Sequence, residues 1–153
     1  MNKSLILILC IVFTIIVMVS SCSNKLNESG YNGFRCDQNG TEYIADTAYY
    51  VRSLGIAIYA YTGGVKKYAF FLNSTTDSTG TYSLDTTGHG SQGYFYDGST
   101  IYQAISGSVS LTQYYNDSLK ILSGTFSFTG RVPGASGNTV DIQYGYMNNI
   151  PRQ

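Results

Sequence analysis

The chain has 153 residues, of which nine are basic and nine acidic, so its formal net charge at pH 7 is zero. Charged residues make up 12% of the sequence, about half of the roughly one quarter that is typical of globular domains. Because no block of like charge occurs, the chain offers no surface that would displace the counterions of a phosphate backbone, and we expect no nucleic-acid partner.

The first element is an apolar segment typical of an export signal. Lys3 supplies its positive charge, and residues 5–19 are apolar except for Thr14. At about 1.5 Å per residue this run would extend about 22 Å as a helix, less than the roughly 30 Å hydrocarbon core of a bilayer. We therefore expect a cleaved signal helix over residues 1–21 rather than a membrane-spanning anchor.

A cysteine directly follows this segment. The residues Val19, Ser20, Ser21 and Cys22 resemble the lipobox that lipoprotein-processing enzymes recognise. The resemblance implies cleavage before Cys22, which would then carry a thioether-linked diacylglycerol and an amide-linked acyl chain such as palmitate. Several acyl chains anchor a protein stably, whereas one gives only marginal binding. An ordinary secretory signal with a neighbouring cysteine is the alternative.

Residues 22–32 are polar and aperiodic, so we expect a lipidated flexible tether followed by one domain over residues 33–153. The mature chain keeps eight basic and nine acidic residues, which gives a formal net charge of −1. Cys36 is the only cysteine left for the domain. No disulfide can form within the domain, and Cys36 is expected to be buried as a small hydrophobic residue.

Beyond residue 33, turn residues alternate with segments of period-two hydrophobicity. Asn39-Gly40, Gly63-Gly64 and Asp97-Gly98 are typical of two-residue hairpin turns. Longer connections are expected at residues 77–80, 86–91, 116–118 and 133–138. Between them, each predicted strand has one apolar face. The residues expected to point inward are Ile56, Ile58 and Ala60; Tyr68, Phe70 and Leu72; Ile105, Val109 and Leu111; Leu122, Phe126 and Phe128; and Val140, Ile142 and Tyr144.

These half-buried strands predict one all-β antiparallel domain of about eight or nine strands, with almost no helix after the signal. Short strands joined by tight turns must close or stack to hide their edges. Periodicity leaves an up-and-down barrel and a two-sheet sandwich equally open.

Three stretches of the mature chain carry a family resemblance: residues 34–45 at its start, residues 80–84 in its middle, and residues 122–128 with the strand from Thr139 and the final Asn149-Ile150-Pro151. They resemble a family of small Gram-negative, Bacteroidetes-type lipoproteins known only as a domain of unknown function. The resemblance implies an envelope address and β architecture, and it implies no activity.

Few residues are available for chemistry. His89 is the only histidine, and one imidazole without a cysteine partner cannot make a zinc site of the usual kind, so we expect no metal and no cofactor besides the lipid. Asp77, Asp85, Asp97 and Asp117 lie beside turn residues, where an aspartate bonds its own backbone. We assign no catalytic residue and expect a non-enzymatic protein.

Tyrosine is the strongest compositional signal, with 15 tyrosines, seven phenylalanines and no tryptophan. An apolar ring with a polar tip suits cross-strand packing on an outer sheet face and also contact with a partner. The candidates for a binding surface are Tyr49, Tyr50, Tyr59, Tyr61, Tyr94, Tyr96, Tyr114 and Tyr115.

Together these features predict an envelope lipoprotein, anchored in the outer membrane by its lipid, that acts as a binding or structural module for an envelope protein or a glycan. Which face of the membrane it occupies is left open. Two other functions also stay open. A glycan hydrolase would need Asp85, Asp97 and Asp117 in one pocket, and a ligand carrier would need a barrel with an open interior.

Overall fold

The computed structural model describes residues 33–74, 79–86, 90–114 and 120–153, and within these ranges all regular secondary structure is strand. The predicted all-β class is thereby confirmed for the described residues, in which no helix is long and apolar enough to cross a bilayer. The strands are β1 (Gly33–Gln38), β2 (Thr41–Ile44), β3 (Thr47–Arg52), β4 (Ile56–Thr62), β5 (Val65–Leu72), β6 (Gly80–Ser83), β7 (Gln92–Asp97), β8 (Thr100–Tyr114), β9 (Ile121–Arg131) and β10 (Thr139–Pro151).

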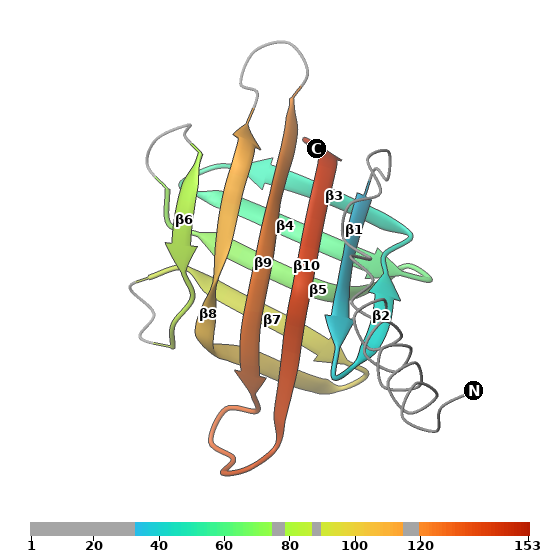
Figure 1. Cartoon of the computed structure of the whole chain (residues 1–153), viewed down its shortest axis with the longest axis vertical. Helices are drawn as coiled ribbons and strands as arrows, with labels where there is room; N and C mark the ends of the chain where they lie inside the picture. The colour runs from blue at the N-terminus through green and yellow to red at the C-terminus, as the bar shows by residue number, and fades with distance from the viewer. Residues whose placement is uncertain (1–32, 75–78, 87–89, 115–119) are drawn as a thin grey trace, which may run out of the picture.

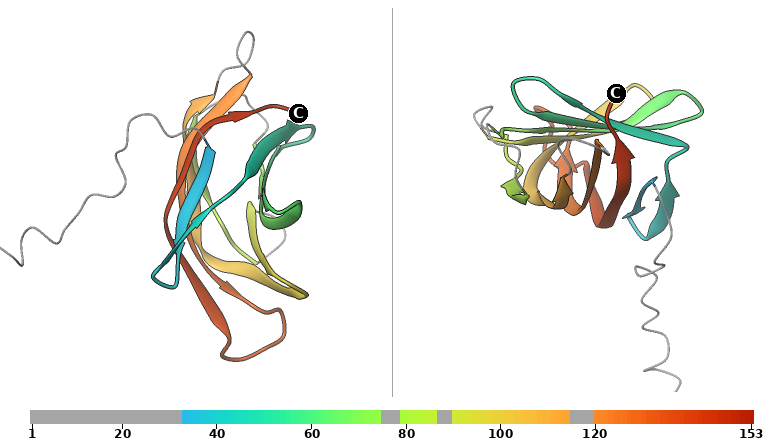
Figure 2. Two further views of the ribbon diagram at one scale, coloured as in Figure 1. Left: turned by 90° about the vertical axis from the view of Figure 1, so that its right-hand side faces the viewer. Right: turned by 90° about the horizontal axis from the view of Figure 1, so that it is seen from above.

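All ten strands belong to one antiparallel sheet with the order β2-β1-β10-β9-β8-β7-β5-β4-β3, while β6 pairs with β8 (Figure 1). Most neighbours in this order are also neighbours in sequence, as in an up-and-down barrel. The sheet curls strongly into a half-barrel (Figure 2). Most of its strand order is therefore that of the predicted barrel. Because the two halves of the sheet face each other, the core lies between two layers, as in the predicted sandwich.

The two ends of the strand order lie close together in sequence and in space. Residues 45–46 alone connect β2, at one end of the order, to β3 at the other. Tyr50 of β3 forms a parallel bridge with Arg152, near the end of the chain. The Gln153 amide donates to the Tyr50 carbonyl at 2.9 Å. These contacts join β3 to the two residues that follow β10.

The core lies between a front layer of β8, β9, β10 and β1 and a back layer of β3, β4, β5 and β7, whose strands run across those in front (Figures 1 and 2). Aromatic rings fill it: Phe34 stacks on Phe126 with ring centroids 4.7 Å apart, and Tyr68 lies 5.1 Å from Phe34. Such pairs add roughly 0.5–1.5 kcal/mol each beyond the burial of their surface. The inward faces predicted for residues 56–60, 68–72 and 122–128 are confirmed.

Two of the predicted hairpin turns occur as expected, and the third is shifted by one residue. Asn39 and Gly40 both have positive φ, as do Gly63 and Gly64, which fits the turn type that matches strand twist. In the third hairpin Asp97 still pairs with Thr100. The turn residues are therefore Gly98 and Ser99, and of these two only Gly98 has positive φ. This pattern is typical of the second kind of two-residue hairpin turn, which has glycine in its first central position.

Two predicted inward residues are wrong, both because of β-bulges. A register shift between Ala104 and Ser106 makes Ala104 fully buried and leaves Ile105 half-buried. A second shift, between Ile142 and Gly145 of β10, turns Tyr144 outward to 61% exposure. A bulge adds one residue to one strand, so period-two alternation fails beyond it.

Several predictions fall outside the described residues. They are the signal over residues 1–21, the tether over residues 22–32 with Cys22, and the residues Asp77, His89, Tyr115 and Asp117. Tyr114 ends β8, but its side chain is likewise outside the described part of the structure.

Candidate binding surfaces

Six aromatic side chains cover the outer face of the back layer, and we call this surface the aromatic face. Period-two alternation explains it, because Ile56, Ile58 and Ala60 point into the core and the residues between them point out. Strand register then aligns the outward residues: Tyr49 opposes Tyr59, and Tyr59 opposes Ala69. The members of the aromatic face are Tyr49 on β3, Tyr59 and Tyr61 on β4, Phe71 on β5, and Tyr94 and Tyr96 on β7.

These rings form one uninterrupted series of contacts across four strands. Tyr49 and Tyr59 have centroids 5.5 Å apart, and Tyr59 meets Phe71 edge-on at 5.9 Å. Phe71 in turn meets Tyr94 at 5.9 Å, and Tyr94 lies 6.4 Å from Tyr96. All of these distances fall within the range of roughly 4.5–7 Å in which aromatic pairs attract, so neighbouring rings restrict one another's motion.

A lysine completes the surface. The Nζ atom of Lys66 lies 4.6 Å from the centroid of Tyr96 and 5.9 Å from that of Tyr59, which is cation–π geometry. Below the rings, Ala69 is fully buried although it points to the outer face. The aromatic side chains therefore cover Ala69, which lies between them. They form one continuous surface.

Two of the phenol groups on this face, those of Tyr61 and Tyr94, have a raised pKa. The hydroxyl oxygens of Tyr49 and Tyr61 are 3.0 Å apart, and this hydrogen bond is the main cause that raises the pKa of Tyr61 to about 12. Burial raises the pKa of Tyr94, whose hydroxyl donates to Gln92 Oε1 at 2.7 Å. The face thus presents aromatic rings, hydroxyl groups and the amino group of Lys66.

Five of the eight predicted tyrosines meet on this surface. Tyr50, by contrast, is 1% exposed and belongs to the core, because it lies on the opposite face of β3 from Tyr49. The sequence prediction missed Phe71 and Lys66. Phe71 could have been found, since it alternates with the inward residues Phe70 and Leu72. Lys66 could not, because a bulge beside Tyr61 turns it outward.

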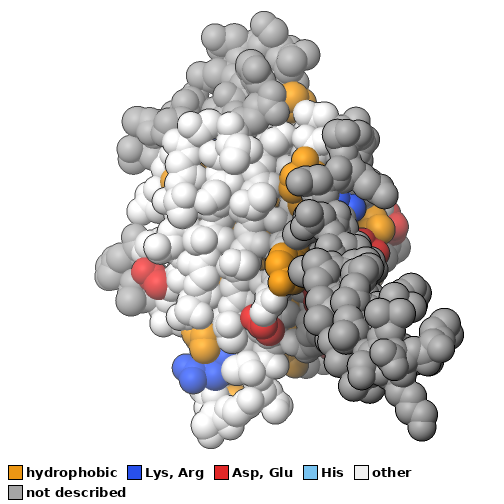
Figure 3. All heavy atoms as spheres, in the orientation of Figure 1, with side chains coloured by type: hydrophobic (Ala, Val, Ile, Leu, Met, Phe, Trp, Pro, Cys, Tyr) orange, Lys and Arg blue, Asp and Glu red, His pale blue; other side chains and the backbone are white. Residues whose placement is uncertain are grey.

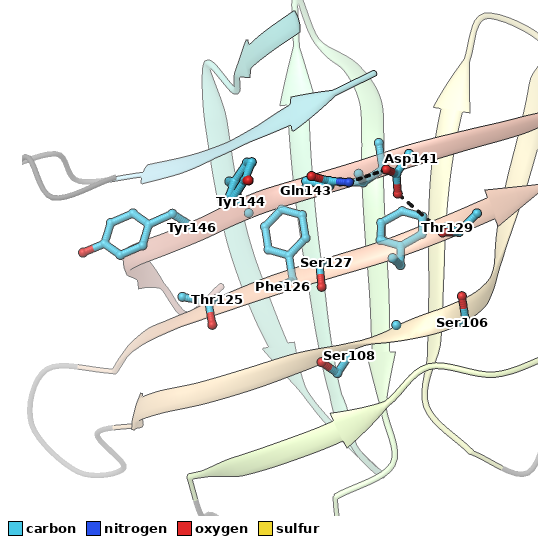
Figure 4. Close-up of a pocket in the computed structure, with 14 residues that line it drawn as sticks. Ser106, Ser108, Thr125, Phe126, Ser127, Thr129, Asp141, Gln143, Tyr144 and Tyr146 are labelled. Atoms are coloured by element: carbon cyan, nitrogen blue, oxygen red, sulfur yellow. Dashed lines mark hydrogen bonds between the residues drawn. The ribbon is translucent and has the colours of Figure 1, made fainter. Parts of the chain in front are cut away.

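A second surface, which we call the hydroxyl groove, lies on the outer face of the front layer (Figure 4). This layer carries few charged or hydrophobic side chains on its outer side (Figure 3), and the groove has a volume of about 610 Å³. Tyr144 and Tyr146 lie toward one end and Asp141 and Thr129 toward the other (Figure 4). The polar and aromatic residues that line it are Ser106, Ser108, Thr125, Phe126, Ser127, Phe128, Thr129, Asp141, Gln143, Tyr144 and Tyr146.

Hydrogen bonds hold the acidic end of the groove in place. The Asp141 amide donates to Asn39 Oδ1 at 2.9 Å, which ties β10 to the first hairpin turn. Gln143 Nε2 and Thr129 Oγ1 both donate to the Asp141 carboxylate, the second at 3.4 Å. The sequence prediction missed this site, because it requires Tyr144 to leave the core.

The acidic residues considered for catalysis do not meet in the described part of the structure. Asp85 lies beside Ser91 at the start of β7, since its amide donates to the Ser91 carbonyl at 3.1 Å, whereas Asp97 ends the same strand. Among the described residues no group of three or more histidine, cysteine and acidic side chains could hold a metal ion.

Comparison with known proteins yields one family. A family model described as a domain of unknown function (DUF6252) matches residues 32–151. This match confirms the part of the expected resemblance that concerns a domain of unknown function. Neither curated proteins nor solved structures gave a match.

Proposed function

Since the chain belongs to the DUF6252 family, we propose from its own geometry that it is a lipid-anchored envelope protein whose aromatic face binds a protein partner. The continuous contact of six rings across four strands carries this proposal. The proposed activity needs no catalytic residue. Aromatic rings fill the space between the two layers, so we place the binding surface on the outside of the half-barrel.

Preorganisation supports a binding role for the aromatic face. Binding costs free energy when mobile side chains become ordered, and a tyrosine has only two side-chain torsions to fix. On this face the rings already restrict one another, and Phe71 at its centre is 39% exposed. Tyrosine and phenylalanine are enriched in protein interfaces, and tyrosine is among the residues that contribute most of the binding energy.

Charge indicates the chemistry of the partner. The charged residues of the central strand β5 are Lys66 and Lys67, and Lys66 is held over two rings. A partner that offers an apolar patch with an acidic side chain beside it would complement this surface. A flat glycan is the alternative occupant, because tyrosine rings also stack on sugars.

The address is proposed from the sequence alone. An apolar signal followed by Cys22 supports acylation and an anchor in the outer membrane of the cell envelope. Intact-mass analysis of the chain isolated from its native host tests this. We expect an N-terminus at Cys22 with a mass increase equal to a diacylglycerol and one acyl chain, and a retained leader or an unmodified Cys22 would contradict it.

The binding role is tested by chemical cross-linking in the native host, followed by purification and mass spectrometry of the captured protein. We expect the wild type to capture one partner, and the double variant Tyr59→Ala and Phe71→Ala to capture at least tenfold less. Tyr144→Gly, which changes the opposite layer, serves as the control and should capture as much as the wild type.

Thermal unfolding of the same variants separates binding from a purely structural role. If the rings only stabilise the sheet, the double variant will lower Tm while capturing the partner as well as the wild type does. That result would contradict the proposal, as would a face-dependent loss of co-purifying glycan with no captured protein.

A further inference from the structure

The hydroxyl groove has the size and the lining of a ligand site distinct from the aromatic face. Its volume of about 610 Å³ lies within the roughly 300–1,000 Å³ that is usual for small-molecule sites. The groove is lined by residues of β8, β9 and β10 and the aromatic face by residues of β3, β4, β5 and β7, and these strands form opposite layers (Figure 2). An occupant of the groove would therefore leave the aromatic face free.

The lining of the groove selects for a neutral ligand. Its only ionisable acid is Asp141, and neither lysine nor arginine is among the residues that line it. An anionic ligand would face this carboxylate without a compensating cation among the lining residues. A metal ion would find a single carboxylate, fewer ligands than calcium or magnesium normally requires.

The lining also selects for a ligand rich in hydroxyl groups. Serine and threonine hydroxyls on β8 and β9 each offer one donor and two acceptor positions, and an apolar ligand would remove water from them without replacing its hydrogen bonds. The carboxylate of Asp141, held by Gln143 and Thr129, adds a strong acceptor for a pair of neighbouring hydroxyls.

Tyr144 provides an aromatic wall, and the backbone holds it there under strain. Its φ of 50° is unfavourable for a bulky residue. The bulge that contains it depends on the neighbouring Gly145, where a Cβ atom would lie 2.5 Å from the Phe126 ring. Beside it, the Tyr146 ring is backed by the Arg35 guanidinium at 5.6 Å.

From these features we propose that the hydroxyl groove binds a neutral saccharide. The ring of Tyr144 stacks against the C–H face of the sugar, Asp141 and Gln143 orient its hydroxyls at the other end, and the serine and threonine hydroxyls of the floor bind the remainder. Apolar faces and dense hydroxyls on one small molecule are the combination that this lining complements.

The test uses the full-length chain, purified in a detergent without a sugar headgroup, on an array of neutral and anionic oligosaccharides. Affinity for the strongest neutral glycan is then measured by calorimetry. We expect Tyr144→Gly and Asp141→Asn each to weaken binding at least tenfold, and Tyr144→Phe to retain it. Tyr59→Ala, on the aromatic face, is the matched control and should bind as the wild type does.

Tyr144→Gly keeps the experiment independent of folding, because glycine adopts a φ of 50° without strain. We expect this variant to unfold at the same or a higher temperature than the wild type while losing the sugar. The proposal is overturned if no neutral glycan binds at millimolar concentration, if anionic glycans bind better, or if Tyr144→Gly binds normally. Its outcome is independent of whether a protein occupies the aromatic face.

Discussion

At the scale of single residues, a chain of hydrogen bonds pairs two polar groups of the core, the Cys36 thiol and the Tyr68 hydroxyl. The Cys36 thiol donates to the Tyr68 hydroxyl at 3.2 Å, and that hydroxyl donates to Gln38 Oε1 at 3.4 Å. Cys36 is 3% exposed, as expected from the sequence, and Tyr68 is fully buried. Burial is the main cause that raises the pKa of the Cys36 thiol from 9.0 to about 12, so its reactive thiolate form is scarce.

We predict that Cys36 of the native protein resists thiol reagents at pH 8. The raised pKa of the thiol keeps it protonated at pH 8, the thiolate is the reactive form, and burial restricts access further. Alkylation followed by peptide mass spectrometry should show modification of Cys36 at least about a hundredfold slower than in guanidinium. Comparable rates in the two conditions would show that the layers open readily at β1.

At the scale of elements, bulges and glycines let the long strands of the front layer bend. Gly107 of β8 has a φ of 130°, and a Cβ atom there would lie 2.3 Å from the Ser127 carbonyl oxygen. The register shift between Ala104 and Ser106 lies directly before it. The close approach of β8 to β9 at this point therefore depends on the absence of a side chain at residue 107.

We predict that Gly107→Ala lowers the free energy of unfolding by at least about 2 kcal/mol, because it combines an unfavourable φ with overpacking against the backbone of β9. Gly80→Ala on β6 is the control, since a Cβ atom there meets nothing within 4 Å, and it should change stability by less than about 0.5 kcal/mol. Urea denaturation measures both. Equal effects would mean that the bend does not require glycine.

At the scale of the whole molecule, the curled sheet buries groups that can lose a proton only in alkaline solution. Cys36 and Tyr68 lie in the core, and burial raises the pKa of both. An acid whose pKa is raised by folding stabilises the native state fully below its unfolded pKa, and this contribution is lost as the pH rises toward the folded pKa. Alkaline pH therefore acts against the packing of the two layers.

We predict that the free energy of unfolding falls as the pH rises from about 9 to 12, because the unfolded chain releases protons that the native chain keeps. Denaturant midpoints measured at intervals across this range test the slope. Cys36→Ala removes one of the two groups and should reduce the slope between pH 9 and 10. A midpoint that stays constant or rises would contradict the burial of these groups.

The sequence by itself determined the strands, most inward faces and two hairpin turns, because period-two hydrophobicity and positive-φ residues act over a few neighbouring positions. It also indicated that tyrosines form a surface. Only the tertiary structure decided which ones do so. Tyr50 differs from Tyr49 merely by facing the other way, and the side chain of Tyr114 and all of Tyr115 lie beyond what the structure describes.

Bulges account for most of what remained hidden. One extra residue in β10 moves Tyr144 from the predicted core to the rim of the hydroxyl groove, and one in β5 brings Lys66 to the aromatic face. A bulge depends on how one strand bends against its paired neighbour, so the alternation within a single strand does not mark it. The curl of the sheet, and with it the separation of the two surfaces, follows from the pairing and bending of all its strands together.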